Sequence, residues 1–144
     1  MIRDATHADI PRLVEMGGRF IASSQYGKFF ADNATARRDL MARLIDHPDG
    51  ALFGSEKDGA LVGMIGVYAY QHPWSGERIG GEVFWWVEPE ARGRRGMKLR
   101  RRAEQWAADA GCVRFQMIAP NEKVARAYRR LGYAKLEECY QRDI

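Results

Sequence analysis

The spacing of hydrophobic and polar residues predicts a mixed chain of helices and strands. Apolar residues recur every three or four positions over residues 10–21 and again over 35–46, as they do on one face of an amphipathic helix. Two apolar runs, 51–56 and 61–70, are predicted strands, and the turn sequence Lys57-Asp58-Gly59 joins them as a hairpin. The run GGEVFWWVEP, which begins at Gly80, predicts a third long strand.

The rest of the chain predicts a strand–helix–strand unit with a further helix after it. The elements expected here are helices over 94–111 and between the cap Asn121 and the stop Gly132, with strands at 2–5, 113–118 and 134–140. The predicted order is therefore β-α-α-β-β-β-α-β-α-β. Because a strand that returns through a helix runs parallel to its predecessor, we expect one parallel strand pair in a mainly antiparallel sheet. Helices on both faces would give a three-layer α+β fold.

Composition favours one globular domain over residues 1–144, with 46% hydrophobic and 29% charged residues. The sequence has no run of 18 apolar residues, and its first 16 residues lack the apolar segment of a signal peptide. Only Cys112 and Cys139 occur, which favours the reducing cytoplasm over a disulfide-bonded protein. The histidines and carboxylates form no cluster with metal-ligand spacing, so we expect no metal.

Positive charge is concentrated in one segment. The net charge is +4, yet residues 92–102, RGRRGMKLRRR, hold seven basic side chains in eleven positions. This segment begins in a glycine-containing loop between a predicted strand and a predicted helix. Free N–H groups at a helix N-terminus bind phosphate, and arginines add to the attraction. The segment therefore indicates a phosphate-bearing cofactor or a nucleic-acid backbone, with a solvated basic helix face as the simpler alternative.

Two segments resemble the GNAT acetyltransferases. VEPEARGRRGMKL is similar to the family's V-x-P-x-x-R-G opening, and NEKVARAYRRLGY matches its Asn-x6-Tyr-x3-Gly-Tyr segment at all four positions. The family's Arg/Gln-x-x-Gly-x-Gly/Ala loop is incomplete in both registers. A loop that starts at Arg92 places Arg95 and Met97 at the glycine positions, and one that starts at Ala91 places Arg94 at the middle glycine. The ending LGYAKLEECYQRDI resembles the phage-associated branch of the family.

The resemblance implies that the parallel strand pair splays apart at the cofactor. It also implies acetyl-CoA as co-substrate, with its pyrophosphate against the backbone of residues 94–97 and its pantetheine arm along the strand 84–87. The implied cofactor-binding residues are Trp86, Val87, Arg92, Gly93, Arg94, Arg95, Gly96, Met97, Lys98 and Asn121. Trp85 and Trp86 point to opposite faces of their strand, so we expect one in the core and the other at the acceptor cleft.

The resemblance also implies that Tyr128 protonates the departing thiolate, although its position on an apolar stripe fits a core aromatic residue equally well. Glu82 is the candidate general base, with solvent exposure at a strand end as the alternative. His72 and a water chain are further candidates for the base. Neither cysteine has a neighbouring base in the sequence, so both are poor nucleophile candidates.

The function predicted from these residues is direct acetyl transfer from acetyl-CoA to a primary amine in a ternary complex. The acceptor is a small molecule or a peptide, and residues 20–32 and 72–78 are expected to shape its cleft. The alternatives are a basic nucleic-acid-binding module and an acetyltransferase that acts on an amine carried by RNA, such as aminoacyl-tRNA. A membrane partner is not expected, and a homodimer is left open.

Overall fold

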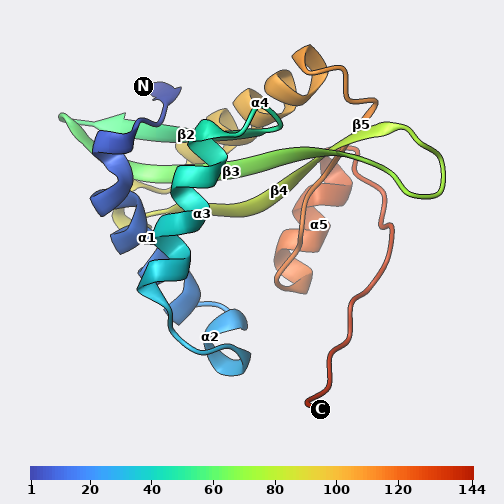
Figure 1. The fold of residues 1–144 in the computed structure, drawn as a ribbon, viewed down its shortest axis with the longest axis horizontal. Helices are drawn as coiled ribbons and strands as arrows, with labels where there is room; N and C mark the ends of the chain where they lie inside the picture. Colours follow the sequence, from blue (N-terminus) through green and yellow to red (C-terminus); the bar gives the residue numbers. More distant parts are fainter.

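All 144 residues are described by a computed structural model, in which a five-stranded sheet lies between helices (Figure 1). The strands are β1 (Ile2–Asp4), β2 (Gly50–Lys57), β3 (Ala60–Gln71), β4 (Arg78–Val87) and β5 (Arg114–Gln116). They follow one another in sequence order across the sheet, and only β4 and β5 are parallel. The predicted α+β fold with a single parallel pair is confirmed.

The helices are α1 (Ile10–Ala22), α2 (Tyr26–Phe29), α3 (Ala34–Asp46), α4 (Arg94–Asp109) and α5 (Glu122–Arg130), with short 3₁₀ turns η1 (His7–Asp9) and η2 (Pro89–Ala91). Figure 1 shows α1 and α3 side by side across one face of the sheet, with α4 behind it. No helix combines the length and apolar composition needed to cross a membrane.

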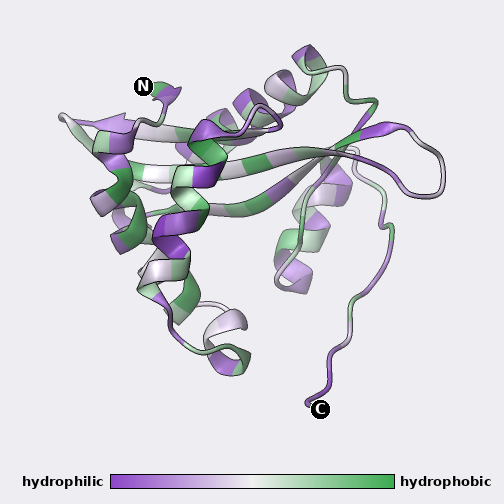
Figure 2. Cartoon of the chain, viewed as in Figure 1, coloured by the Kyte–Doolittle hydropathy of each residue, from purple (hydrophilic) through white to green (hydrophobic).

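Each face of the sheet has its own hydrophobic core. On the first face the buried stripe of α1, with Leu13 and Met16, packs with Met41 of α3 against Met64 and Phe84 of the sheet. The bands of hydrophobic and hydrophilic colour that alternate along α1 in Figure 2 follow this amphipathic spacing. On the second face α4 contributes to the second core, whose buried members are Phe53, Ile65, Val67, Val87, Ala91, Leu99 and Ala103.

The sheet opens where β4 leaves β5. The two strands pair only from Ile79–Arg114 to Gly81–Gln116, so from Glu82 onward β4 has a strand on one side only. A bulge lies at the same point, because Phe84 pairs with Gly66 and Glu82 with Val67, which leaves Val83 without a partner on β3. The predicted splay is therefore confirmed, and it leaves the backbone of residues 82–87 open along one edge.

Two local predictions differ from the structure. The strand expected at 134–140 is wrong: residues 133–144 have no regular secondary structure, and Leu136 and Tyr140 are largely exposed. A strand needs a partner edge and a buried face, and the three-residue β5 offers this segment little of either. The helix α2 was not predicted, since a single turn is too short to show a helical period.

Candidate active site

The gap between β4 and β5 brings the two candidate catalytic residues to the backbone of the same residue, Ile118. The Ile118 N–H donates to Glu82 Oε2 at 2.9 Å, and the Tyr128 hydroxyl donates to the Ile118 carbonyl oxygen at 3.1 Å. The Tyr128 ring stacks against Trp85 with 6.4 Å between ring centroids. The Asn121 side chain begins α5 by accepting from the Val124 N–H at 3.0 Å, which places Tyr128 two turns into that helix.

Burial sets the charge state of both groups. Glu82 is 8% exposed, and its desolvation raises the pKa of the carboxyl to about 7, although the Ile118 N–H opposes this shift. Burial also raises the pKa of Tyr128, and the nearby Glu82 charge adds to the effect. At neutral pH the site therefore holds a carboxyl that can accept a proton and a phenol that keeps its own. The expectation that Glu82 faces solvent is thereby excluded.

The basic loop and the first turn of α4 lie next to this pair. Gly93, with φ of 120°, is the cap residue of α4, and Arg94 and Arg95 keep the negative φ expected of non-glycine residues. A Cβ on Gly96 would approach Trp85 Cζ2 to 3.2 Å, so a glycine here allows the indole to lie against the helix. The Trp85 Nε1–H is buried and has no hydrogen-bond acceptor.

These features fit acetyl-CoA. An unpaired indole donor, the open edge of β4 and the free amides at the start of α4 are groups that a pantetheine arm and a pyrophosphate would satisfy. The prediction that one tryptophan lies in the core is confirmed for Trp86, which belongs to the core under α1 and α3. Trp85 instead faces α4 and Tyr128, and the sequence did not place it among the cofactor-binding residues.

The basic residues divide into two groups. Arg92, Arg94, Arg95 and Lys98 line a cavity of about 340 Å³ beside the start of α4. Arg100 and Arg102 serve the fold instead: Arg100 is 6% exposed and pairs with Glu104, and Arg102 lies 4.2 Å from the centroid of the Phe53 ring. The segment 92–102 is therefore not one continuous exposed basic face. This finding weakens the hypothesis that the segment binds nucleic acid.

The remaining candidates have local roles. Arg92 Nε donates to the Val87 carbonyl oxygen at 3.1 Å, and its guanidinium lies over the Trp86 ring. The ring of His72 accepts from the Trp74 N–H, so its hydrogen bond stays within the connection between β3 and β4. Cys112 and Cys139 are both free thiols, and Cys139 lies in the irregular C-terminal segment.

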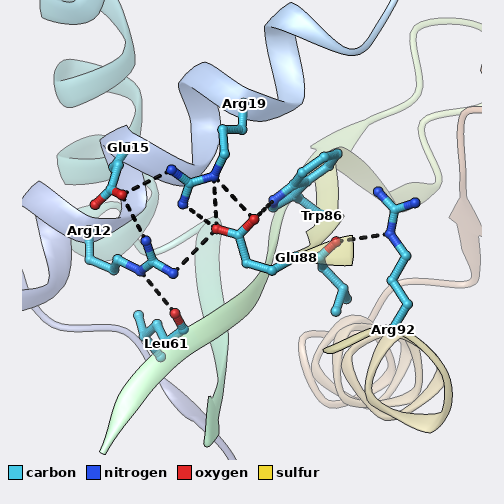
Figure 3. Close-up of polar contacts among 8 residues, drawn as sticks. Arg12, Glu15, Arg19, Leu61, Trp86, Glu88 and Arg92 are labelled. Carbon is cyan, nitrogen blue, oxygen red and sulfur yellow. Dashed lines mark hydrogen bonds and ion pairs between the residues drawn. The ribbon is translucent and has the colours of Figure 1, made fainter. Parts of the chain in front are cut away.

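A buried carboxylate that the sequence did not reveal ties α1 to the end of β4 (Figure 3). Glu88 is 3% exposed and accepts hydrogen bonds from Arg12 and Arg19 of α1 and from Trp86 Nε1. Burial alone would raise the pKa of Glu88, but the hydrogen bonds and charge of Arg19, the Trp86 hydrogen bond and the charge of Arg12 together outweigh it, and the pKa is lowered. Contacts between residues about 70 positions apart leave no mark in sequence periodicity.

Replacing Glu88 with glutamine is expected to lower the free energy of unfolding by about 2 kcal/mol at pH 7, because two arginines lose their buried partner. Since both arginines are partly exposed, solvent reduces the loss below that of a fully buried pair. A depressed pKa means that the stabilisation exists above the ordinary pKa and disappears as pH falls through the native value. Urea unfolding should therefore show a difference between parent and variant at pH 7, and this difference should shrink as the pH is lowered below the ordinary carboxyl pKa.

The exposed Glu15, which contacts the same two arginines, is the matched control for this experiment. Glu15→Gln should leave stability almost unchanged, because exposed ion pairs contribute little. Equal destabilisation by both variants would show that Glu88 has no special role in joining α1 to β4.

Comparison with known proteins agrees with this geometry. The sequence model of the acetyltransferase (GNAT) family matches residues 20–133. Similar folds occur in a transcriptional regulator from Bacillus halodurans C-125 (TM-score 0.80, 19% identity), an aminoglycoside antibiotic 6'-N-acetyltransferase from Acinetobacter haemolyticus (0.75, 20%) and a ribosomal-protein-alanine N-acetyltransferase from Brucella melitensis biovar Abortus 2308 (0.74, 17%). Each alignment covers 100% of this chain and 99% of the other. No curated protein sequence gives a significant match.

Because the family match spans well over half of the sequence, the chain belongs to the acetyltransferase (GNAT) family and is an acetyl-CoA-dependent N-acetyltransferase. The three solved structures have low sequence identity and support the fold alone. The resemblance of the C-terminal sequence to the phage-associated branch stays a prediction.

Proposed function

We propose that the chain transfers acetyl directly from acetyl-CoA to a primary amine in a ternary complex, with Glu82 as general base and Tyr128 as general acid. The observation that carries this assignment is the shared contact of both side chains with Ile118 in the gap between β4 and β5. The raised pKa of Glu82 supports its role, because this carboxylate can take a proton near pH 7, and Tyr128 holds its proton at neutral pH and can donate it to the departing thiolate.

In the proposed reaction the acceptor nitrogen loses two protons. An ammonium acceptor gives one proton to the Glu82 carboxylate, and the free amine attacks the thioester carbon. The C–S bond breaks as the C–N bond forms, and the departing thiolate takes the Tyr128 proton. The second proton released from nitrogen restores the tyrosine, and Glu82 returns its proton to water. The products are the acetylated amine, free CoA thiol and one proton.

We assign the binding of acetyl-CoA to residues around the gap. The edge of β4 at Trp86 and Val87 would pair with the pantetheine arm, and the amides of residues 94–97 would hold the pyrophosphate. Arg92, Arg94 and Lys98 are placed to contact phosphates from the side. Gly93 and Gly96 allow the close approach, and Asn121 positions α5.

Charge reversal in the loop tests this assignment. Arg95→Glu and Lys98→Glu are each expected to weaken acetyl-CoA binding about tenfold or more, since each replaces attraction to phosphate with repulsion. Calorimetric titration with acetyl-CoA measures the change. Lys98 is needed beside Arg95 because Arg95 Nη1 also contacts Ser55 Oγ and the Glu56 carbonyl, so its loss affects packing as well.

Arg101→Glu is the control, because Arg101 is exposed on the same helix but does not line the cavity. Its affinity should match that of the parent. Folded Arg95→Glu and Lys98→Glu proteins with parental affinity would place the phosphates elsewhere.

The overall activity is tested by incubating the protein with acetyl-CoA and panels of small amines, peptides and aminoacylated RNA while the free CoA thiol is measured. Thiol release that requires an amine, with acetyl found on that amine by mass spectrometry, supports direct transfer. A stable acetyl-protein formed without any amine would contradict the ternary complex.

A further inference from the structure

A second cavity, of about 240 Å³, lies on the face of the sheet covered by α1 and α3 (Figure 1). Three helices and two strands contribute to its wall, whose members are Gly17, Phe20, Ile21, Tyr26, Arg37, Leu40, Met41, Met64, Val83 and Phe84. Its volume is below the roughly 300–1,000 Å³ typical of pockets for drug-sized ligands. The cavity therefore suits a small apolar body.

Arg37 is the one charged residue in this wall. Its side chain is 17% exposed, and its Nη1 pairs with Asp32, a loop carboxylate that is 78% exposed. The Nε of Arg37 is buried and has no hydrogen-bond acceptor. The Nε edge of this guanidinium thus lacks the carboxylate that a buried arginine normally binds with two parallel hydrogen bonds.

Two adjacent glycines within α1 lie against the Arg37 side chain. A Cβ on Gly17 would lie 3.4 Å from Arg37 Cδ and 3.3 Å from Met41 Cε, and one on Gly18 would lie 3.5 Å from Arg37 Nη2. Each glycine inside a helix costs about 1 kcal/mol relative to alanine. The two glycines therefore lower the stability of α1 at the position where the Arg37 side chain lies against it.

The cavity also adjoins the strand segment that carries Glu82. Val83, the bulge residue that directly follows Glu82, belongs to the wall. Tyr26 also belongs to the wall, and burial raises the pKa of its phenol, with the charge of Glu82 adding to the effect. A ligand in this cavity would thus contact a cation and lie beside the strand segment that carries the general base.

We propose that the acceptor is a small primary amine that carries a carboxylate, with an apolar body between the two groups. The carboxylate binds the Arg37 guanidinium, the apolar body fills the cavity, and the amine points to Glu82. This inference rests on the proposed function, since it names the acceptor class for the same acetyl transfer.

Matched amines with and without a carboxylate test the proposal. The pairs are 4-(aminomethyl)benzoate with benzylamine and 6-aminohexanoate with pentylamine, and kcat/KM is measured from CoA thiol release. The parent protein should prefer the carboxylate in at least one pair by about tenfold or more, as expected when a buried charged donor would otherwise be left unpaired. Arg37→Met should abolish this preference, and Arg37→Lys should retain only part of it.

Arg38→Met is the matched control, because Arg38 is the next residue of α3 and is exposed. It should keep the parental preference, and all variants should keep parental acetyl-CoA affinity in calorimetry. Equal rates within both pairs, no acetylation of any of the four amines, or an unchanged preference in Arg37→Met would overturn the inference. Failure of the parent protein to bind acetyl-CoA would instead overturn the proposed function, so the two failures are distinguishable.

Discussion

Tyr128→Phe is expected to lower the acetylation rate about 100- to 10,000-fold, which is the usual contribution of a general acid or base. The substitution keeps the ring that stacks on Trp85 and removes only the hydroxyl. The lost hydrogen bond to the Ile118 carbonyl should cost about 1 kcal/mol of stability, so the protein should remain folded. Acetyl-CoA affinity should be retained, because the reduced rate reflects an interaction made in the transition state.

Tyr133→Phe is the control for this experiment. Tyr133 lies 5.5 Å from Tyr128 between ring centroids, but its hydroxyl contacts Glu104 and Arg100 rather than the gap. Its removal should leave turnover close to that of the parent. A Tyr128→Phe protein that acetylates at the parental rate would make Tyr128 a core residue and leave solvent as the proton source.

Glu82→Gln is expected to reduce kcat/KM by a similar factor, about 100- to 10,000-fold, because the general base is lost. The glutamine side-chain oxygen can still accept from the Ile118 N–H, which preserves the local structure. In the parent protein kcat/KM should fall as pH drops below about 7, where Glu82 becomes protonated. The pH profile of kcat/KM for Glu82→Gln should lack this inflection and keep only the inflection caused by deprotonation of the acceptor amine.

The same substitution should stabilise the protein at high pH. A pKa raised from 4.5 to about 7 means that the native state binds more protons than the unfolded state between these values, so stability falls as pH rises through this window. A shift of this size corresponds to at most about 3 kcal/mol. Urea unfolding at pH 8 should therefore show Glu82→Gln to be more stable than the parent, and the gain should disappear near pH 4.

The exposed Glu90 provides the comparison, since Glu90→Gln should change neither the pH profile nor the stability. An unaltered inflection near pH 7 in Glu82→Gln would assign the base to another group, with His72 or a water chain as the remaining candidates. A variant that loses activity without gaining stability at pH 8 would show that Glu82 is not held in a desolvating environment.

Local sequence patterns predicted most of this fold because its elements have clear periods and caps. The α1 stripe, the hairpin turn at Asp58-Gly59 and the Asn121 cap each act within a few residues, and the structure contains all three. The strand at 134–140 failed because alternation alone forms no strand without an adjacent edge. The short β5 lies beside an open gap, and no local pattern reports its length.

Fewer of the site residues could be predicted from the sequence, because contacts between distant segments determine their environments. Tyr128 and Glu82 were named from a family resemblance, and the structure places both against Ile118. Glu88 and Arg37 were not named, because their environments depend on contacts with distant segments of the chain. Which of Trp85 and Trp86 lies in the core depends on the face of β4 that each side chain occupies, and the sequence gives only their alternation.

The most direct test of the central claim is a crystal structure of the protein with acetyl-CoA bound. The account predicts the pyrophosphate against the amides of residues 94–97, the pantetheine arm along the open edge of β4, and the sulfur beside the Tyr128 hydroxyl, with the acetyl group facing Glu82. Acetyl-CoA bound away from the gap between β4 and β5, or with its sulfur remote from Tyr128, would contradict it.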